Sequence, residues 1–262
     1  MKKRMFAIIM LVCTIAISIG ASAEENGSLN DFANRLKKNA SVETISATVE
    51  AAEDDVSFGP ALRMEDPFFQ KVRSSAYLRE TEYSREANVM IELKNVSGRT
   101  LYPDEASITA YNAAGEVIDE ETYSSYGPNM VKNGESLYIW DWFYGFDVPV
   151  AEISWFEVKL ESETSSYTAY DQIAAQALVS DGIAYALVEN TTENDIYGLD
   201  ATIVVENDEK VLLDICDVNT GNSSGIFPGS IMILRARAED YANDDPLMEG
   251  NATAIVLHEL DN

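Results

Sequence analysis

The sequence predicts an all-β protein built from two tandem β-sandwich modules. Three observations predict it: an N-terminal export signal, short segments in which apolar and polar residues alternate, and an internal repeat with a period of 95 residues. The expected boundaries are 1–23 for a signal peptide, 24–70 for a short, partly helical leader, 71–166 for the first module and 167–262 for the second.

The N-terminus contains the three parts of a secretory signal peptide. Residues 1–4 are basic, residues 5–19 are mostly apolar, and residues 21–23 read Ala-Ser-Ala, a small-residue cleavage site. The apolar run is short for a membrane span, and Val12 before Cys13 does not fit a lipoprotein signal. We therefore expect a secreted or extracellular protein of bacterial type, with no membrane insertion after cleavage. An uncleaved N-terminal anchor is the alternative.

The chain is strongly acidic, with a formal net charge of -27. Cleavage would remove Lys2, Lys3 and Arg4 and bring the charge to -30 (-27 minus 3). Nucleic acids and anionic membranes attract clustered Lys and Arg, so this charge argues against both as partners. Cationic partners, bound calcium and a simple solvated surface are all compatible with it. Only Cys216 remains after cleavage, so no intramolecular disulfide is expected.

The leader differs in pattern from the rest of the chain. Leu29, Phe32 and Leu36 are spaced as on one face of a helix, which predicts a helix over 29–38. The segment 41–52 suits either a helix or a strand, and both interpretations stay open. From about residue 75 the pattern has the two-residue period of β-strands, with turn residues between short runs.

The repeat appears when the sequence is shifted by 95 residues without a gap. Apolar positions then coincide with apolar positions, and turn residues with turn residues. The matched pairs are Asn95 with Asn190, Leu101-Tyr102 with Ile196-Tyr197, Ala106-Ser107-Ile108 with Ala201-Thr202-Ile203, Asn112 with Asn207, Asp119 with Asp214, and Gly134 with Gly229. A period of about a hundred residues fits one sandwich domain per unit.

Each unit carries hairpin turns at matching places, 112–115 and 207–210, followed by a glycine turn at Gly134 or Gly229. Tyr111-Asn112 with Gly115, and the turns at 133–135 and 227–230, resemble the FxLYD-type modules of bacterial exported proteins. This resemblance implies two immunoglobulin-like β-sandwiches and an exported setting. It implies no activity, because that family shares no catalytic residues.

No catalytic motif stands out in the sequence. His258 is the only histidine, and no nucleophile elbow, zinc-protease motif or glycine-rich phosphate loop accompanies it. We therefore expect no enzyme and no zinc site. With 45 acidic residues, a secreted hydrolase with an unlocated carboxylate pair stays open as an alternative.

Calcium is the one cofactor for which the sequence offers ligands. The loop that begins with Asp217 and Asn219, and the acidic pair Asp244 and Asp245, supply the oxygen ligands that calcium prefers. The first loop starts like an EF-hand but lacks its later ligands, so a polar hairpin loop is the competing interpretation.

An aromatic row is the sharpest candidate for a binding surface. Tyr138, Trp140, Trp142 and Tyr144 alternate, which places them on one face of a strand. The repeat pairs this row with Ile233, Arg235 and Arg237, so we expect the row on the outer face of the first module. If exposed, the row suits a glycan or a protein partner at the cell surface. If covered, it packs under the leader or the second module.

Together these features predict a secreted, non-catalytic binding or structural protein of the bacterial cell envelope or extracellular space, with protein-interaction or spacer modules. The first alternative is a carbohydrate-binding module that uses the aromatic row, and the second is a secreted hydrolase.

Overall fold

The computed structural model describes residues 56–260, except residues 167, 222–224, 242 and 244. The predicted signal peptide, the helix expected over 29–38 and the segment 41–52 lie outside these residues. The prediction of an all-β sandwich fold is confirmed, because strands dominate this part of the chain and η1 (Val150–Glu152) is its one short 3-10 helix. Across the described ranges, no helix is long and apolar enough to cross a membrane.

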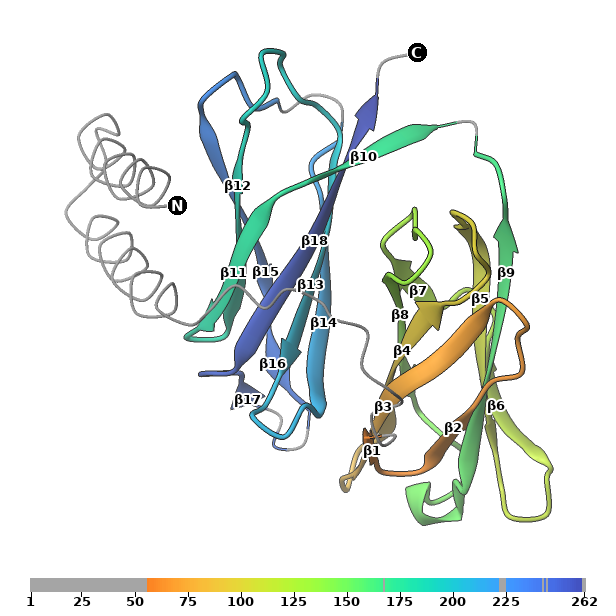
Figure 1. Cartoon of the computed structure of the whole chain (residues 1–262). Helices are drawn as coiled ribbons and strands as arrows, with labels where there is room; N and C mark the ends of the chain where they lie inside the picture. The colour runs from red at the N-terminus through yellow and green to blue at the C-terminus, as the bar shows by residue number, and fades with distance from the viewer. Residues whose placement is uncertain (1–55, 167, 222–224, 242, 244, 261–262) are drawn as a thin grey trace. The chain divides into compact units, whose positions relative to one another are not determined.

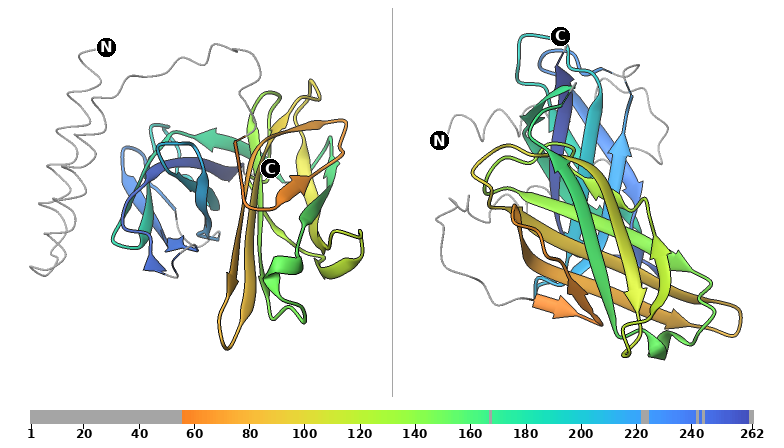
Figure 2. Two further views of the ribbon diagram at one scale, coloured as in Figure 1. Left: turned by 90° about the horizontal axis from the view of Figure 1, so that it is seen from below. Right: turned by 90° about the vertical axis from the view of Figure 1, so that its right-hand side faces the viewer.

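The first sandwich consists of two sheets in two layers (Figures 1 and 2). A five-stranded sheet has the order β1-β3-β4-β8-β7, and a four-stranded sheet has the order β2-β9-β5-β6. The strands are β1 (Val56–Phe58), β2 (Ala61–Arg63), β3 (Phe69–Glu80), β4 (Arg85–Asn95), β5 (Tyr102–Tyr111), β6 (Val117–Glu121), β7 (Ser125–Gly127), β8 (Ser136–Tyr144) and β9 (Trp155–Glu163).

The first sandwich begins earlier than the boundary at residue 71 that the sequence suggested. β1 adds a parallel edge to β3, β2 adds a parallel edge to β9, and β3 itself starts at Phe69. Residues 56–70 of the expected leader therefore belong to this sandwich. The two edge strands are only three residues long, too short to show a two-residue period in the sequence.

The second sandwich also has two sheets, ordered β10-β18-β13-β14 and β11-β12-β15, and a small hairpin of β16 and β17. The strands are β10 (Ala169–Ile173), β11 (Ala175–Ser180), β12 (Ile183–Glu189), β13 (Leu199–Glu206), β14 (Leu212–Asn219), β15 (Ile231–Arg237), β16 (Glu239–Asp240), β17 (Asp245–Pro246) and β18 (Asn251–Leu260).

Equivalent hydrogen bonds occur within each of the two sandwiches, 95 residues apart. Asn95 is fully buried, and its Nδ2 donates to the carbonyl oxygens of Arg99 (2.8 Å) and Val131 (2.9 Å). Asn190 is fully buried too, and its Nδ2 donates to the equivalent carbonyls of Asn194 and Ile226. In both places the amide satisfies backbone groups where a strand leaves its sheet, which explains why an asparagine stands there.

Each sandwich has its own hydrophobic core between its sheets. Alternate residues of the strands point inward, as the two-residue period requires. The core of the first sandwich is centred on Phe143 and Phe156, which are fully buried with ring centroids 5.7 Å apart. The second core is built from smaller residues such as Ala186, Leu199 and Ile203.

A third apolar cluster joins the two sandwiches. It contains Tyr77, Met90 and Tyr138 of the first sandwich and Val204, Leu212 and Ile215 of the second. These residues lie on the outer face of the β3-β4-β8 layer and on strands β13 and β14. The outer face of one sheet is therefore partly an interior surface of the protein.

Candidate functional site

The outward side chains of β3, β4 and β8 form four rows across the sheet. The strand register places one residue of each strand in every row. The rows are Arg79–Glu86–Tyr144, Tyr77–Asn88–Trp142, Ser75–Met90–Trp140 and Arg73–Glu92–Tyr138.

The last two rows are covered by the second sandwich. Tyr138 is only 6% exposed and packs in the joining cluster with Met90, and Trp140 is partly buried against the same cluster. Half of the aromatic row thus packs against β13 and β14. For Tyr138 and Trp140, the role that the structure shows is contact between the sandwiches.

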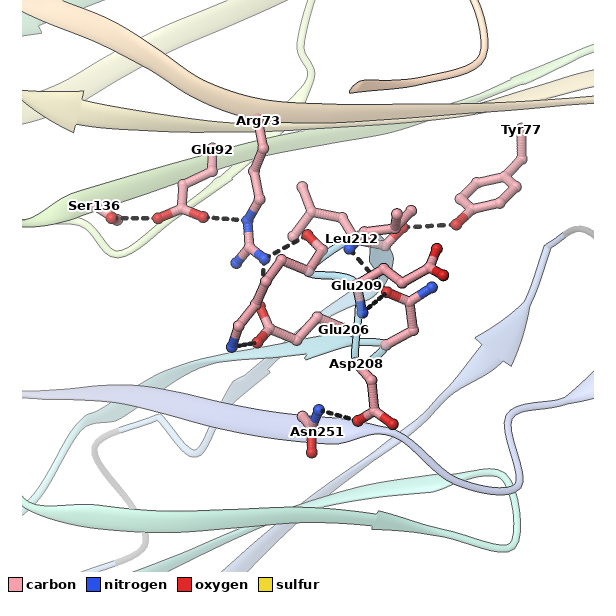
Figure 3. A network of polar contacts seen from close by, with 12 residues as sticks. Arg73, Tyr77, Glu92, Ser136, Glu206, Asp208, Glu209, Leu212 and Asn251 are labelled. Carbon is pink, nitrogen blue, oxygen red and sulfur yellow. Dashed lines mark hydrogen bonds and ion pairs between the residues drawn. The ribbon is translucent and has the colours of Figure 1, made fainter. Parts of the chain in front are cut away.

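A polar network completes the covered area (Figure 3). Arg73 binds Glu92 through Nε (2.6 Å), and its Nη1 donates to Glu206 and to the carbonyl oxygen of Lys210 (2.7 Å). Glu92 accepts a further hydrogen bond from Ser136 Oγ, and Tyr77 donates to the carbonyl oxygen of Leu212, 2.7 Å away.

The charges of this network compensate one another. Burial raises the pKa of Glu206, but hydrogen bonds from Lys210 and Arg73 outweigh it, so the net pKa lies below the usual value. Burial lowers the pKa of Arg73 and the charges of Glu92 and Glu206 raise it, with a net increase. Both groups therefore stay ionised, and removal of one partner would leave a buried charge without its counterion.

A second contact lies at another edge of the junction, which is the area where the two sandwiches meet. Asn129 donates a hydrogen bond from Nδ2 to Asp200, and Gly127 approaches Thr202 so closely that an added Cβ would stand 2.2 Å from Thr202 Oγ1. Burial, followed by the charges of Asp217 and Glu259, raises the pKa of Asp200 to about 6.

The first two rows, by contrast, line a pocket of about 250 Å³. All six of their residues contribute to its wall, and the second sandwich supplies Glu239, Asp240 and Tyr241. The pocket therefore forms where the two sandwiches meet, beside the covered half of the sheet.

The aromatic wall of the pocket is open to solvent. Trp142 is 54% exposed and Tyr144 is 64% exposed. Their ring centroids lie 5.8 Å apart with an interplanar angle of 74°, so the rings form a corner and not a flat platform. Exposed aromatic side chains beside a pocket are typical of interaction sites.

The polar wall contains three carboxylates and one guanidinium group. Arg79 Nη2 lies 2.5 Å from Glu86 Oε2, and Glu239 binds Arg237 at 3.0 Å. Asp240 accepts a hydrogen bond from Asn243 Nδ2 at 2.8 Å.

Asn88 lies between Tyr77 and Trp142 in its row and is 6% exposed. Its Oδ1 is buried and has no hydrogen-bond partner among the described residues. A buried acceptor of this kind costs free energy unless a donor satisfies it.

Asp214 holds the strand that carries Glu239 and Asp240. Its Oδ2 accepts the backbone N–H of Glu239 at 2.9 Å, and its Oδ1 accepts the N–H of Ile215 at 2.8 Å. Burial raises the pKa of Asp214 to about 6 despite these hydrogen bonds. Burial also raises the pKa of Tyr241, and the charges of Asp214 and Glu239 add to that increase.

The structure thus divides the aromatic row, because Tyr138 and Trp140 lie in the junction and Trp142 and Tyr144 lie at the pocket. Sequence reasoning missed the other residues of the pocket. The polar residues Glu86, Asn88 and Glu92 alternate with apolar residues, and this alternation indicates the outer face of β4. No local signal marks 239–241, because these residues reach the pocket only through the contact between the sandwiches.

The expected calcium ligands that the structure describes lie in strands and not in the two loops that the sequence suggested. Asp217 and Asn219 belong to β14, Asp245 belongs to β17, and Asp244 lies outside the described residues. No group of three or more His, Cys, Asp or Glu side chains that could hold a metal occurs in the part of the chain that the structure describes. Calcium binding stays a prediction.

His258 and Cys216 lie in strands. The ring Nδ1 of His258 is 3.3 Å from the carbonyl oxygen of Glu259, in the strand β18 that pairs with both β10 and β13. Cys216 is buried in β14, and burial, with the charge of Asp214, raises the pKa of its thiol.

Comparisons with known proteins identify no family. No family model matches the sequence, and no curated protein matches it. Among solved structures, this chain is similar to the crystal structure of red sea bream transglutaminase, with 10% sequence identity and a TM-score of 0.21. The match covers 92% of this chain and 32% of that one, so this chain spans about a third of that protein's length. A likeness at this score says nothing about activity.

Proposed function

We propose that this protein is an exported, non-catalytic binding protein whose site is the pocket between the sandwiches, with a saccharide as its ligand. The observation that carries the proposal is the division of the outer face of the β3-β4-β8 layer. Its covered half joins the sandwiches, and its open half presents Trp142 and Tyr144 beside polar groups from both of them.

The side chains of the pocket suit a saccharide. The apolar face of a sugar ring can rest on an indole ring, and its hydroxyl groups need both donors and acceptors nearby. Trp142 offers the ring, Arg79 offers donors, and Glu86, Asn88 and Asp240 offer acceptors. At about 250 Å³ the pocket is slightly smaller than usual ligand sites, which suits one sugar unit of a longer chain.

Export and the immunoglobulin-like character of the two sandwiches are parts of this proposal. The export signal supports a ligand outside the cell or in its envelope. The hydrogen bonds that recur 95 residues apart support two copies of one module, as the resemblance to FxLYD-type modules implies.

A structural spacer is the second candidate, and the junction itself favours it. The network around Arg73 and the cluster around Met90 stabilise one arrangement of the two sandwiches. A spacer needs such a junction but does not need an open aromatic corner with polar groups around it.

The test is retention of the protein, without residues 1–23, on a panel of immobilised wall and dietary polysaccharides. Native protein is compared with Trp142→Ala and with Tyr123→Ala, which removes an aromatic residue that is 84% exposed and outside the pocket. We expect one polysaccharide to retain the native protein and Tyr123→Ala but not Trp142→Ala. Retention on none, or equal retention of all three proteins, would overturn the saccharide site and leave the spacer.

The same assay tests the absence of catalysis. We expect no soluble sugar to be released from the polysaccharide that retains the protein. Release that depends on Glu86 or Asp240 would make the protein a hydrolase instead.

A further inference from the structure

The pocket has a buried floor and an exposed rim, and the inference drawn from this shape rests on the function proposed above. Tyr77 and Asn88 form the floor, since they line the pocket and are only 7% and 6% exposed. Trp142 and Tyr144 form the rim, since they line the same pocket and are 54% and 64% exposed. A ligand therefore enters past the two rings of the rim and moves toward the floor.

The second sandwich closes the pocket at the floor. Tyr77 donates a hydrogen bond to the carbonyl oxygen of Leu212, 2.7 Å away, and belongs to the apolar cluster that joins the sandwiches. Tyr241 also lines the pocket and packs against the same cluster. Two residues of the lining are thus part of the packed junction, and a ligand stops where it meets them.

The rim, by contrast, lies at an edge of the five-stranded sheet. In the described part of the chain, β7 pairs with β8 only from Tyr138 to Trp140. Trp142 and Tyr144 follow this paired segment, so no further strand stands beside them and their side chains border solvent. The pocket thus has one open end. The interior of a polysaccharide chain needs a groove with two open ends, because the chain continues in both directions.

The floor also contains a hydrogen-bond acceptor without a donor. Oδ1 of Asn88 is buried and has no hydrogen-bond partner among the described residues. In a saccharide chain, the hydroxyl at the linkage position is free only on the unit at the non-reducing end. This hydroxyl is a donor and points away from the rest of the chain, so it arrives first when the chain enters end-on. A hydrogen bond to Asn88 would offset the cost of the buried acceptor.

We propose that the pocket binds the non-reducing end of a saccharide chain and not its interior. The terminal sugar unit lies against the rim, its free linkage hydroxyl donates to Asn88, and the rest of the chain extends into solvent. The rings of Trp142 and Tyr144 stand at 74° to each other, which agrees with this arrangement. A corner holds one sugar unit, whereas a row of coplanar rings holds several consecutive units.

The experiment measures, by calorimetry, the binding of the trimers and hexamers of amylose, cellulose, xylan and chitin. Each oligomer is titrated before and after borohydride reduction, which opens the sugar ring at the reducing end. In the series that binds, we expect one protein molecule per chain and no effect of reduction. We also expect the dissociation constants of trimer and hexamer to agree within about twofold, because both chains present the same end.

Two variants test the floor. Asn88→Ala removes the acceptor and is expected to weaken the binding of trimer and hexamer alike, by about tenfold. Asn251→Ala removes an exposed asparagine of β18 outside the lining and is expected to bind as the native protein does. Circular dichroism shows whether each variant is folded, and Asn88→Ser replaces Asn88→Ala if the alanine variant is not. Native affinity in a folded variant of Asn88 would contradict its hydrogen bond to the chain end.

Failure of this inference is distinguishable from failure of the proposed function. Tighter binding of the hexamer, more than one protein molecule per hexamer, or loss of binding after reduction would each overturn recognition of the non-reducing end. The saccharide site itself would stand in these cases if Trp142→Ala weakens the binding. Binding of none of the oligomers also overturns the inference, and retention on the polysaccharide panel then tests the saccharide site by itself.

Discussion

The two sandwiches differ most clearly on the outer face of equivalent strands. β4 and β8 in the first sandwich pair in the same register as β12 and β15 in the second, as in the pairs Asn88↔Trp142 and Ile183↔Arg237. In β8 the outward residues are Tyr138, Trp140 and Trp142, and in β15 the equivalent residues are Ile233, Arg235 and Arg237. The inward residues of both strands face a core.

This difference shows that the outer face of a sheet carries aromatic residues where the other sandwich covers it and charged residues where solvent does. Arg235 and Arg237 are exposed, as an uncovered sheet face requires. Tyr138 is buried because the second sandwich packs on it, and Trp142 lies where that cover ends. The two sandwiches share hydrogen bonds that maintain the fold, and they diverge where one of them contacts the other.

The largest expected effect comes from breaking the junction. Arg73→Met leaves the carboxylates of Glu92 and Glu206 in a mostly buried place without their shared cation. We expect the free energy of unfolding to fall by about 3 kcal/mol, because loss of one partner of a buried ion pair costs several kcal/mol. Urea denaturation measures it. A loss no larger than that of the exposed Arg235→Met would show that the junction adds little stability.

An intermediate effect is expected from the aromatic row itself. Trp140→Ala removes a partly buried ring from the joining cluster, and Arg235→Ala removes its exposed counterpart in the second sandwich. We expect a loss of about 2 kcal/mol for Trp140→Ala and less than about 0.5 kcal/mol for Arg235→Ala. The free energies of unfolding are measured by thermal and urea denaturation. Equal losses for the two variants would mean that the outer faces of β8 and β15 contribute equally to stability.

The smallest expected effect concerns pH and the matched residues Asp200 and Glu105. The pKa of Asp200 is about 6 in the folded protein, above its usual value, so the folded state binds its proton more tightly than the unfolded state does. Stability therefore falls as the pH rises from about 4 to about 6, the interval between the unfolded and folded pKa values.

Asp200→Asn removes this effect and keeps an oxygen that can accept the hydrogen bond of Asn129. We expect the variant to be more stable than the native protein by about 1 to 2 kcal/mol near neutral pH and equal to it near pH 4. Glu105→Gln changes the exposed counterpart in β5 and serves as the control. Urea midpoints at several pH values measure this difference in stability. Parallel curves for native protein and Asp200→Asn would show that burial does not raise the pKa of Asp200.

The sequence was sufficient for the class of fold, because alternation and turn residues are local signals. The repeat alone matched Asn95 with Asn190, and the structure shows that both are buried and explains them through their amide hydrogen bonds. The repeat also placed Trp142 on the outer face through its pairing with Arg237.

The pocket could not be found in this way. Glu239 and Asp240 come from a short hairpin strand of the second sandwich, and nothing in their neighbourhood in the sequence indicates that they lie near Trp142. Such a site depends on how two sandwiches pack, which involves contacts between residues more than 90 positions apart. The edge strands β1 and β2 were missed for a simpler reason, because three residues are too few to display a period.

Quenching of Trp142 fluorescence tests most directly whether the open half of the outer face is the binding site. Trp140→Phe/Trp155→Phe leaves Trp142 as the one tryptophan of the chain, and acrylamide reaches it because its side chain is half exposed. The polysaccharide that retains the protein is then added. We predict that bound saccharide shields Trp142 and lowers the quenching. Unchanged quenching while the saccharide remains bound would place the ligand elsewhere and contradict the site described here.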